Sequence, residues 1–199
     1  ENNENNKENI SNENNTSSNS NSNITNSENK DTANNSQTET RQGVFAEPKE
    51  ETISSFSTKI YSKDSSRQNN VQITCNTLNG TIVKSKETFS FCNTVGPSTK
   101  EKGYQEADIF VHNGKKKKGF GGGNCQVSTT LYNAVLSVPT LEVTERHEHS
   151  NYVPYIEDGK DAAVAYGSYD LKFVNNTGSD IKILASATAE AVTVTILSI

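Results

Sequence analysis

Cys125 is the residue whose type and surroundings most strongly indicate chemistry. It follows a glycine-rich run, Gly-Phe-Gly-Gly-Gly-Asn, at residues 119–124. The apolar residues after it recur at helical spacing as far as Pro139, which predicts a helix over about residues 125–137. Unpaired backbone N–H groups and the positive end of the helix dipole favour an anion, and therefore a thiolate, at the start of such a helix. This pattern is typical of a nucleophilic cysteine and makes an enzyme the first hypothesis.

A cysteine nucleophile requires a base that takes its proton, and usually a further residue that orients the base. The candidate bases are His112, His147 and His149. Arg146 could bind a carboxylate through two parallel hydrogen bonds, and Asp161 could orient a histidine or hold a substrate amine. Spacing alone also allows plainer interpretations, namely an ordinary hydrogen-bonded histidine and an arginine in a structural salt bridge.

The other two cysteines admit two interpretations. Cys75 and Cys92 could form a disulfide that leaves Cys125 free, or both could be reduced and packed as small apolar residues. A zinc site made by Cys125, His147 and His149 is less favoured, because the sequence contains no Cys-x-x-Cys pair and no larger group of ligands. We therefore expect neither a metal nor an organic cofactor.

The composition divides the chain into two parts. Fifteen of residues 1–42 are asparagine, and none of them is aromatic. Such a segment cannot bury enough apolar surface to offset the entropy lost on ordering it. We predict that residues 1–52 form a disordered polar tether and that residues 53–199 form one folded domain of ordinary size. A tether of this kind suits a protein held at the membrane or cell wall, with its domain outside the cell.

The charge follows the same division. The chain has a formal net charge of −5, of which the tether carries −6 and the nearly neutral predicted domain +1. Its one basic block, residues 115–118, is expected to be a solvated loop, because no flanking aromatic residues or further basic clusters indicate nucleic-acid binding. No apolar run approaches the roughly 20 residues of a membrane span.

Short alternating segments separated by turns predict a domain dominated by antiparallel sheet. Asn79-Gly80 predicts a hairpin between strands at residues 71–75 and 81–83. The turn at residues 175–178 predicts another hairpin, between residues 169–174 and 181–186. Further strands are expected at residues 88–91, 108–111, 141–144, 162–166 and 192–196. The predicted fold class is α+β, mostly antiparallel β-sheet with one central helix after the glycine-rich loop and Cys125.

Two specific motifs stand out in the predicted domain: Gly-Gly-Gly-Asn-Cys-Gln at residues 121–126 and Arg-His-Glu-His-Ser at residues 146–150. With shorter pieces that run in order along nearly the whole domain, they resemble the VanW family of Gram-positive cell-surface proteins. Cys75 and Cys92 stand at positions where the family pattern has no cysteine. The shorter pieces are residues 56–58, 67–71, 87–91, 96–99, 103–107, 161–164 and 170–176.

The resemblance implies an L,D-transpeptidase that acts on peptidoglycan stem peptides without a cofactor. Cys125 would attack the bond between a third-position diaminopimelate and the terminal D-alanine, and His149 would be the base. The side-chain amine of a diaminopimelate on a neighbouring stem would then resolve the thioester and form a cross-link. The residues implied to contact the stem peptide are Gly123, Gln126, Ser128, Arg146, Ser150 and Asp161.

Two other hypotheses use the same cleft. In one, the domain is a non-catalytic cell-wall module linked to glycopeptide resistance, which holds a stem peptide without turning it over. In the other, it is a cysteine carboxypeptidase or hydrolase that uses water as the acceptor. Thiol reactivity separates the enzymes from the binding module, and access of water to the thioester separates the hydrolase from the transferase. In each case we expect a monomer at the cell surface that does not bind nucleic acid.

Overall fold

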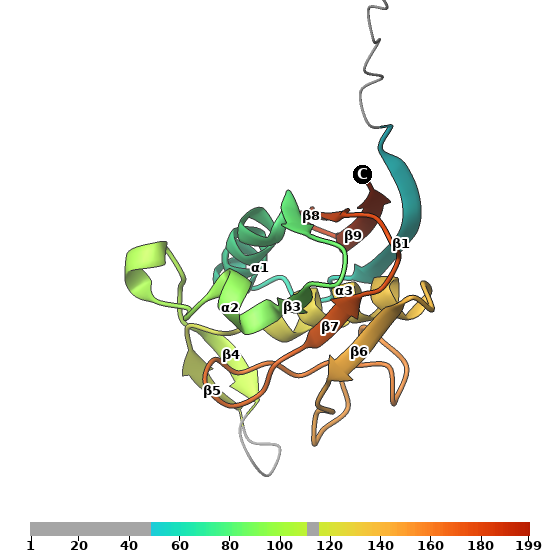
Figure 1. The fold of residues 1–199 in the computed structure, drawn as a ribbon. Helices are drawn as coiled ribbons and strands as arrows, with labels where there is room; N and C mark the ends of the chain where they lie inside the picture. The colour runs from blue at the N-terminus through green and yellow to red at the C-terminus, as the bar shows by residue number, and fades with distance from the viewer. Residues whose placement is uncertain (1–48, 111–115) are drawn as a thin grey trace, which may run out of the picture. The chain divides into compact units, whose positions relative to one another are not determined.

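Our computed structural model describes residues 49–110 and 116–199 of the chain. These residues contain three antiparallel sheets and three α-helices (Figure 1). Every pair of neighbouring strands in these sheets is antiparallel. Helices and sheets do not alternate as they would in a parallel α/β fold. The described residues therefore belong to the α+β class, as the sequence predicts.

The largest sheet has four strands in the order β1-β9-β8-β2. They are β1 (Glu51–Lys59), β2 (Thr81–Val83), β8 (Ile181–Ala187) and β9 (Ala191–Ser198). On β9 the alternating residues Val192, Val194 and Ile196 are fully buried, and the residues between them are partly exposed. This alternation is the period-two pattern of a sheet with one face on the core. The predicted boundary between residues 52 and 53 falls within β1.

The residues around Val71 form a helix rather than the predicted strand. Helix α1 (Ser65–Leu78) begins after Asp64, whose side chain accepts a hydrogen bond from the backbone N–H of Arg67 at 3.0 Å. The buried residues of α1 recur at helical spacing, but two of them are polar. The apolar residues alone therefore do not show the helical period. The buried residues are Asn70, Val71, Thr74, Cys75 and Leu78.

The two predicted hairpins are also wrong. Asn79 ends α1 instead of turning between strands, and its side chain accepts a hydrogen bond from the backbone N–H of Ala185 on β8. The turn at residues 175–178 joins strands of different sheets, because β7 (Lys172–Asn175) pairs with β3 and β6 while β8 pairs with β9 and β2. The side chain of Asn175 is buried and donates to the carbonyls of Val83 and Ser179 at this crossing. Local turn signals therefore fix where the chain turns but not which strands pair.

The second sheet has the order β3-β7-β6, with β3 (Thr88–Ser90) and β6 (Leu141–Glu145) on either side of β7. Strands β4 (Ala107–Phe110) and β5 (Lys116–Gly119) form a separate pair. The basic block expected to be a loop thus lies mostly in β5. A short helix α2 (Phe91–Val95) and a 3-10 turn, Lys100–Lys102, connect β3 to β4. Residues 162–166 contain a single bridge, between Ala165 and Tyr169, instead of a strand.

Helix α3 (Asn124–Leu136) packs against β1 and β9 of the larger sheet and against β6 of the second (Figure 1). Its fully buried apolar residues Val127, Leu131, Ala134 and Val135 join the main core. The same helix carries buried polar side chains that bond to β1. The hydroxyl of Thr130 lies 2.8 Å from that of Thr58, one of several such bonds that fix the rotation of α3 against the sheet.

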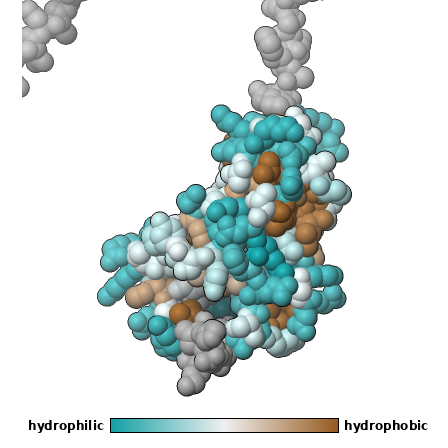
Figure 2. Space-filling model, turned by 60° about the horizontal axis from the view of Figure 1, so that its bottom comes forward, coloured by the Kyte–Doolittle hydropathy of each residue, from teal (hydrophilic) through white to brown (hydrophobic). Residues whose placement is uncertain are grey.

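The view in Figure 2 shows a largely hydrophilic surface on which hydrophobic residues form separate patches. Among the described residues, no helix has the length and apolar composition needed to cross a membrane.

Candidate functional site

Cys125 lies in the first turn of α3, at the end of the glycine loop. Gly123 caps this helix with a φ of 116°, a conformation that L side chains rarely adopt. A Cβ on Gly123 would lie 2.7 Å from Cγ2 of Val71 on α1. The loop is held by Asn70, which donates to the carbonyl of Gly122 at 3.1 Å. The residue type at position 123 is thus required by close packing of the loop against α1.

The Cys125 thiol is half-buried and touches two segments that are distant in sequence. Its Sγ lies 3.4 Å from the carbonyl oxygen and 3.5 Å from the backbone nitrogen of Val164. The side chain of His149 also lies close enough for Cys125 to contribute to the raised pKa of that histidine. A thiol beside a histidine ring is the arrangement in which the ring can take the thiol proton.

His149 is held by Asp161. The ring Nδ1 lies 2.5 Å from Oδ2 of Asp161, and the backbone N–H of His149 donates to the same oxygen at 2.6 Å. The side chains of His149 and Asp161 are only 10% and 8% exposed, so little water competes with these bonds. A proton on Nδ1 leaves Nε2 as the ring nitrogen that can accept a proton from sulfur. Cys125, His149 and Asp161 therefore lie in series as a thiol, an imidazole and a carboxylate, an arrangement that could serve as nucleophile, base and orienting carboxylate.

Arg146 holds the carboxylate rather than a substrate group. Its Nη2 lies 2.9 Å from Oδ1 of Asp161, and its Nε donates to the carbonyl of the same residue at 2.6 Å. The remaining donors bond to Glu148 and to the carbonyl of Gly159, and the guanidinium lies over the ring of Tyr132. Because protein acceptors occupy its fork, Arg146 is a positioning residue for Asp161 in this structure.

Hydroxyl groups on α3 bring the Asp161 segment to the cysteine. Ser128 donates to the carbonyl of Ala162 at 2.6 Å, and the hydroxyl of Thr129 accepts from its backbone N–H at 2.9 Å. Both hydroxyls are fully buried, so an unpaired one would be costly. Ser128 and Thr129 thus fix residues 161–164 along the first turns of α3 and are not open to a ligand.

The surroundings of His149 and Asp161 favour the charged forms of both side chains. Burial lowers the pKa of His149, but hydrogen bonds and charge interactions with Cys125 and Asp161 outweigh it and raise this pKa above the ordinary 6.5. Burial likewise raises the pKa of Asp161, but the bonds from His149 and the charge of Arg146 outweigh it and lower this pKa. Asp161 is therefore a carboxylate, and His149 keeps a proton to higher pH than an exposed histidine.

The other two cysteines are free thiols in a different environment. Burial raises the pKa of Cys75 to about 12. Burial, reinforced by the charge of Asp170, raises the pKa of Cys92 to about 12 as well. Neither supplies a thiolate at neutral pH. Of the two interpretations that the sequence allows for this pair, the structure has reduced thiols rather than a disulfide.

The remaining candidates lie outside the series. His147 bonds to Glu145 and stacks on Tyr169, with the ring centroids 4.7 Å apart. His112 lies outside the described residues. Ser150 is exposed and accepts a hydrogen bond from Asn151. No group of three or more His, Cys, Asp or Glu side chains among residues 49–110 and 116–199 is placed to hold a metal ion, so a zinc site at Cys125, His147 and His149 has no support.

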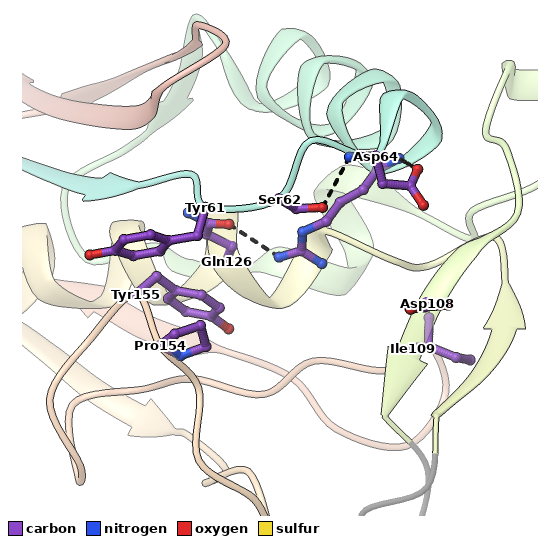
Figure 3. Close-up of a pocket in the computed structure, with 9 residues that line it drawn as sticks. Tyr61, Ser62, Asp64, Asp108, Ile109, Gln126, Pro154 and Tyr155 are labelled. Atoms are coloured by element: carbon purple, nitrogen blue, oxygen red, sulfur yellow. Dashed lines mark hydrogen bonds between the residues drawn. The ribbon is translucent and has the colours of Figure 1, made fainter.

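Two pockets border the Cys125 turn. Asn124 and Val164, the neighbours of the thiol, line a pocket of about 190 Å³ that also contains Cys92 and Tyr166. Gln126 lines the second pocket, of about 170 Å³, which Figure 3 shows with Tyr155 on one side and Asp108 on the other. Gln126 itself is almost fully buried, and its Nε2 donates to the carbonyl of Lys59 at 3.0 Å.

Three contributors to the site were not singled out in the sequence. Thr129 acts through a buried hydroxyl, and Val164 contacts the thiol through its backbone, which carries no signal of residue type. Tyr155 lies in a segment with no regular structure, close enough to Cys125 for the two to interact electrostatically. Only the helical spacing of Cys125, Ser128 and Thr129 could have indicated that the two hydroxyls lie near the thiol.

Comparison with known proteins finds a family model and relatives that match this chain. The family model described as VanW like protein matches residues 66–197. The uncharacterized protein YoaR of Bacillus subtilis (strain 168) is 36% identical over 146 residues, which cover 73% of this chain and 48% of that protein. The vancomycin B-type resistance protein VanW of Enterococcus faecalis (strain ATCC 700802 / V583) is 34% identical over 119 residues, which cover 57% of this chain and 42% of that protein. This chain thus spans less than half the length of each of these curated relatives. No solved structure matches.

Proposed function

Because the chain belongs to the VanW family, we propose that its folded domain is a cysteine acyltransferase, an L,D-transpeptidase that cross-links peptidoglycan stem peptides. The observation that carries this proposal is the series Cys125–His149–Asp161, with its short bond between His149 and the carboxylate. A module that only binds a peptide has no need of a thiol, a base and an orienting carboxylate in line. The helix after the glycine loop contributes by presenting the thiol at its N-terminus.

In the first half-reaction His149 takes the Cys125 proton and sulfur attacks the carbonyl carbon of the donor diaminopimelate. Negative charge develops on the carbonyl oxygen, and backbone N–H groups at the start of α3 are the donors best placed to stabilise it. The C–N bond to D-alanine then breaks, and His149 gives its proton to the leaving amine. Thioester and free D-alanine are the products.

In the second half-reaction the side-chain amine of an acceptor diaminopimelate attacks the thioester carbon. His149 takes the proton that the amine loses and returns it to sulfur as the C–S bond breaks. The new amide joins two third-position residues, and the thiol is restored. Asp161 stabilises the ring in each step in which His149 carries both protons.

The location and partners form part of the same proposal. A stem-peptide substrate requires the domain to lie outside the cell, with residues 1–52 linking it to the membrane or wall. The relative from Enterococcus is named for vancomycin resistance, and vancomycin is a glycopeptide antibiotic, which supports a role in the cell wall. Protease treatment of intact cells would test this location, because an external domain is cleaved while cytoplasmic proteins are spared.

The test is the intact mass of the full chain after incubation with a disaccharide-tetrapeptide muropeptide, with the muropeptide products measured in the same run. Wild type should gain the mass of an acyl adduct and release a cross-linked dimer and D-alanine. Cys125→Ala should do neither. Cys92→Ala is the matched control, since it removes a nearby thiol whose raised pKa excludes it as a nucleophile, and it should retain both activities.

The products distinguish the proposed transferase from its rivals. An adduct with tripeptide as the sole product would show a hydrolase. Binding of the muropeptide without adduct or product would show a binding module. An adduct that persists in Cys125→Ala would refute the assignment of the nucleophile.

A further inference from the structure

The second pocket, which Gln126 lines, contains a cation, Arg67, that forms no ion pair with a carboxylate among the described residues. This pocket, here called the Arg67 pocket, is defined by Tyr61, Asp64, Arg67, Asp108, Gln126 and Tyr155. It has a volume of about 170 Å³ and is open to solvent. In Figure 3 the rings of Tyr61 and Tyr155 lie on the opposite side of the pocket from Asp108.

The Arg67 pocket adjoins the turn of α3 that carries Cys125. Gln126 directly follows Cys125 on α3. Tyr155, which lines this pocket, lies close enough to both Cys125 and Arg67 for their charges to affect its pKa. The pocket therefore borders the turn of α3 that carries the thiol.

The position of Arg67 is fixed by its neighbours. Its backbone N–H bonds to Asp64 at the start of α1, and its Nη2 donates to Oε1 of Gln126 at 3.1 Å. Gln126 is in turn fixed by Thr58 and Lys59, so its amide oxygen stays directed at the guanidinium. Among the described residues no acid lies within ion-pair distance of the Arg67 side chain. The other N–H groups of its guanidinium can therefore donate hydrogen bonds to the anionic group of a ligand.

The acidic residues of the pocket have another partner. Lys118 on β5 lies 2.9 Å from Oδ1 of Asp108 and 3.9 Å from Oδ2 of Asp64. These side chains are 37–57% exposed, so this ion pair can rearrange at little cost. The pocket thus offers a fixed cation for a carboxylate on one side and exposed acids for an ammonium on the other. The tyrosine rings, on the side of the pocket opposite Asp108, suit a methylene chain.

We propose that the Arg67 pocket binds the amino-acid end of a diaminopimelate side chain, with Arg67 recognising its free carboxylate. This end carries one carboxylate and one amine on the same carbon, at the end of a methylene chain. The inference rests on the proposed function, because that function brings diaminopimelate to Cys125. It makes Arg67 a specificity-determining residue: a lysine side chain, which has the amine but no carboxylate, and an amidated diaminopimelate would both bind weakly.

The experiment measures binding, in the full chain carrying Cys125→Ala, of two synthetic tetrapeptides by titration calorimetry. One contains diaminopimelate with a free side-chain carboxylate, and in the other only this carboxylate is amidated. The free acid should bind about ten- to a hundredfold more tightly, as expected for a charge-assisted bond to arginine. Arg67→Gln should remove this difference by weakening the free acid alone, and Arg67→Lys should restore part of it.

Lys63→Gln is the matched control, because it removes an exposed cation four residues away and should leave both affinities unchanged. Circular dichroism of each variant checks that the fold is retained. Equal affinity of the two peptides, equal weakening of both by Arg67→Gln, or no measurable binding of either would overturn the proposal. A clear preference for the free acid, with no acyl adduct in the wild-type protein, would retain the pocket and reject the transferase. The two proposals can therefore fail separately.

Discussion

Asp161→Asn is the perturbation that tests the series most sharply. The substitution keeps the size of the side chain and removes its charge. The carboxylate now accepts bonds from the His149 ring at 2.5 Å, the His149 backbone at 2.6 Å and Arg146 at 2.9 Å. An amide can place only one oxygen among these three donors, so at least one bond is lost and Arg146 keeps only Glu148 as a charge partner.

The magnitudes follow from the burial of the group. Removing one partner of a buried ion pair costs about 3–5 kcal/mol. Here the amide oxygen retains part of the bonding and the Arg146 side chain is 16% exposed, so we expect a loss of about 2–3 kcal/mol in the free energy of unfolding. Without the carboxylate that orients His149, the rate of acyl-enzyme formation should fall about 100- to 10,000-fold.

The substitution should also move the pH profile. Because His149 must be unprotonated to take the Cys125 proton, activity rises as pH rises through the His149 pKa, which Asp161 helps to hold above 6.5. In Asp161→Asn this pKa drops, so the acidic limb should shift to lower pH. The assay is single-turnover acyl-enzyme formation by mass spectrometry from pH 5 to 10, at a temperature where urea titration shows the variant to be folded.

Two comparisons isolate the cause. Asp158→Asn alters an exposed acid in the same turn and should behave as wild type. In a His149→Ala background, Asp161→Asn should have no further effect on the rate, since Asp161 acts through the ring. A folded Asp161→Asn protein with a wild-type rate and an unshifted acidic limb would refute the reasoning.

Three further predictions use other parts of the chain. Iodoacetamide at pH 7.5 should alkylate Cys125 well before Cys92, whose pKa is raised to about 12 by burial and a neighbouring carboxylate; peptide mapping that finds both modified at one rate would contradict this. Gly123→Ala should destabilise the domain by about 2–3 kcal/mol in urea denaturation, because its φ is 116° and its Cβ would meet a side-chain atom at 2.7 Å. Gly121→Ala, which meets nothing within 4 Å, is the control, and equal stability of the two variants would count against the packing argument. Bonds from a lysine and a histidine lower the pKa of Glu145 to about 2, so its contribution to stability is complete above pH 4.5 and lost as pH falls towards 2. Glu145→Gln should flatten the thermal stability profile over this range, and an unchanged slope would show that the carboxylate contributes nothing.

The sequence by itself determined the local chemistry. The glycine run, Cys125 and the apolar period after it indicated a thiol at a helix start, since those signals are contained in one turn of chain. The alternation along β9 was likewise readable, because one face of that strand packs on the core. The α+β class follows from such local patterns, and so does the family resemblance. Both depend on residue type and order rather than on contacts between distant segments.

Only the tertiary structure decided how these parts meet. Helix α1 was hidden because its buried face includes Asn70 and Thr74, whose polar groups are satisfied by the glycine loop and its neighbours. The role of Asp161 depends on hydroxyls of α3 that draw its segment to the cysteine, and Arg146 proves to bind this carboxylate. The choice of His149 over His147 is also a matter of packing, because two histidines with similar sequence neighbours bond to different acids. Spacing along a chain limits which residues can meet, but the packing of α3 against distant segments selects those that do.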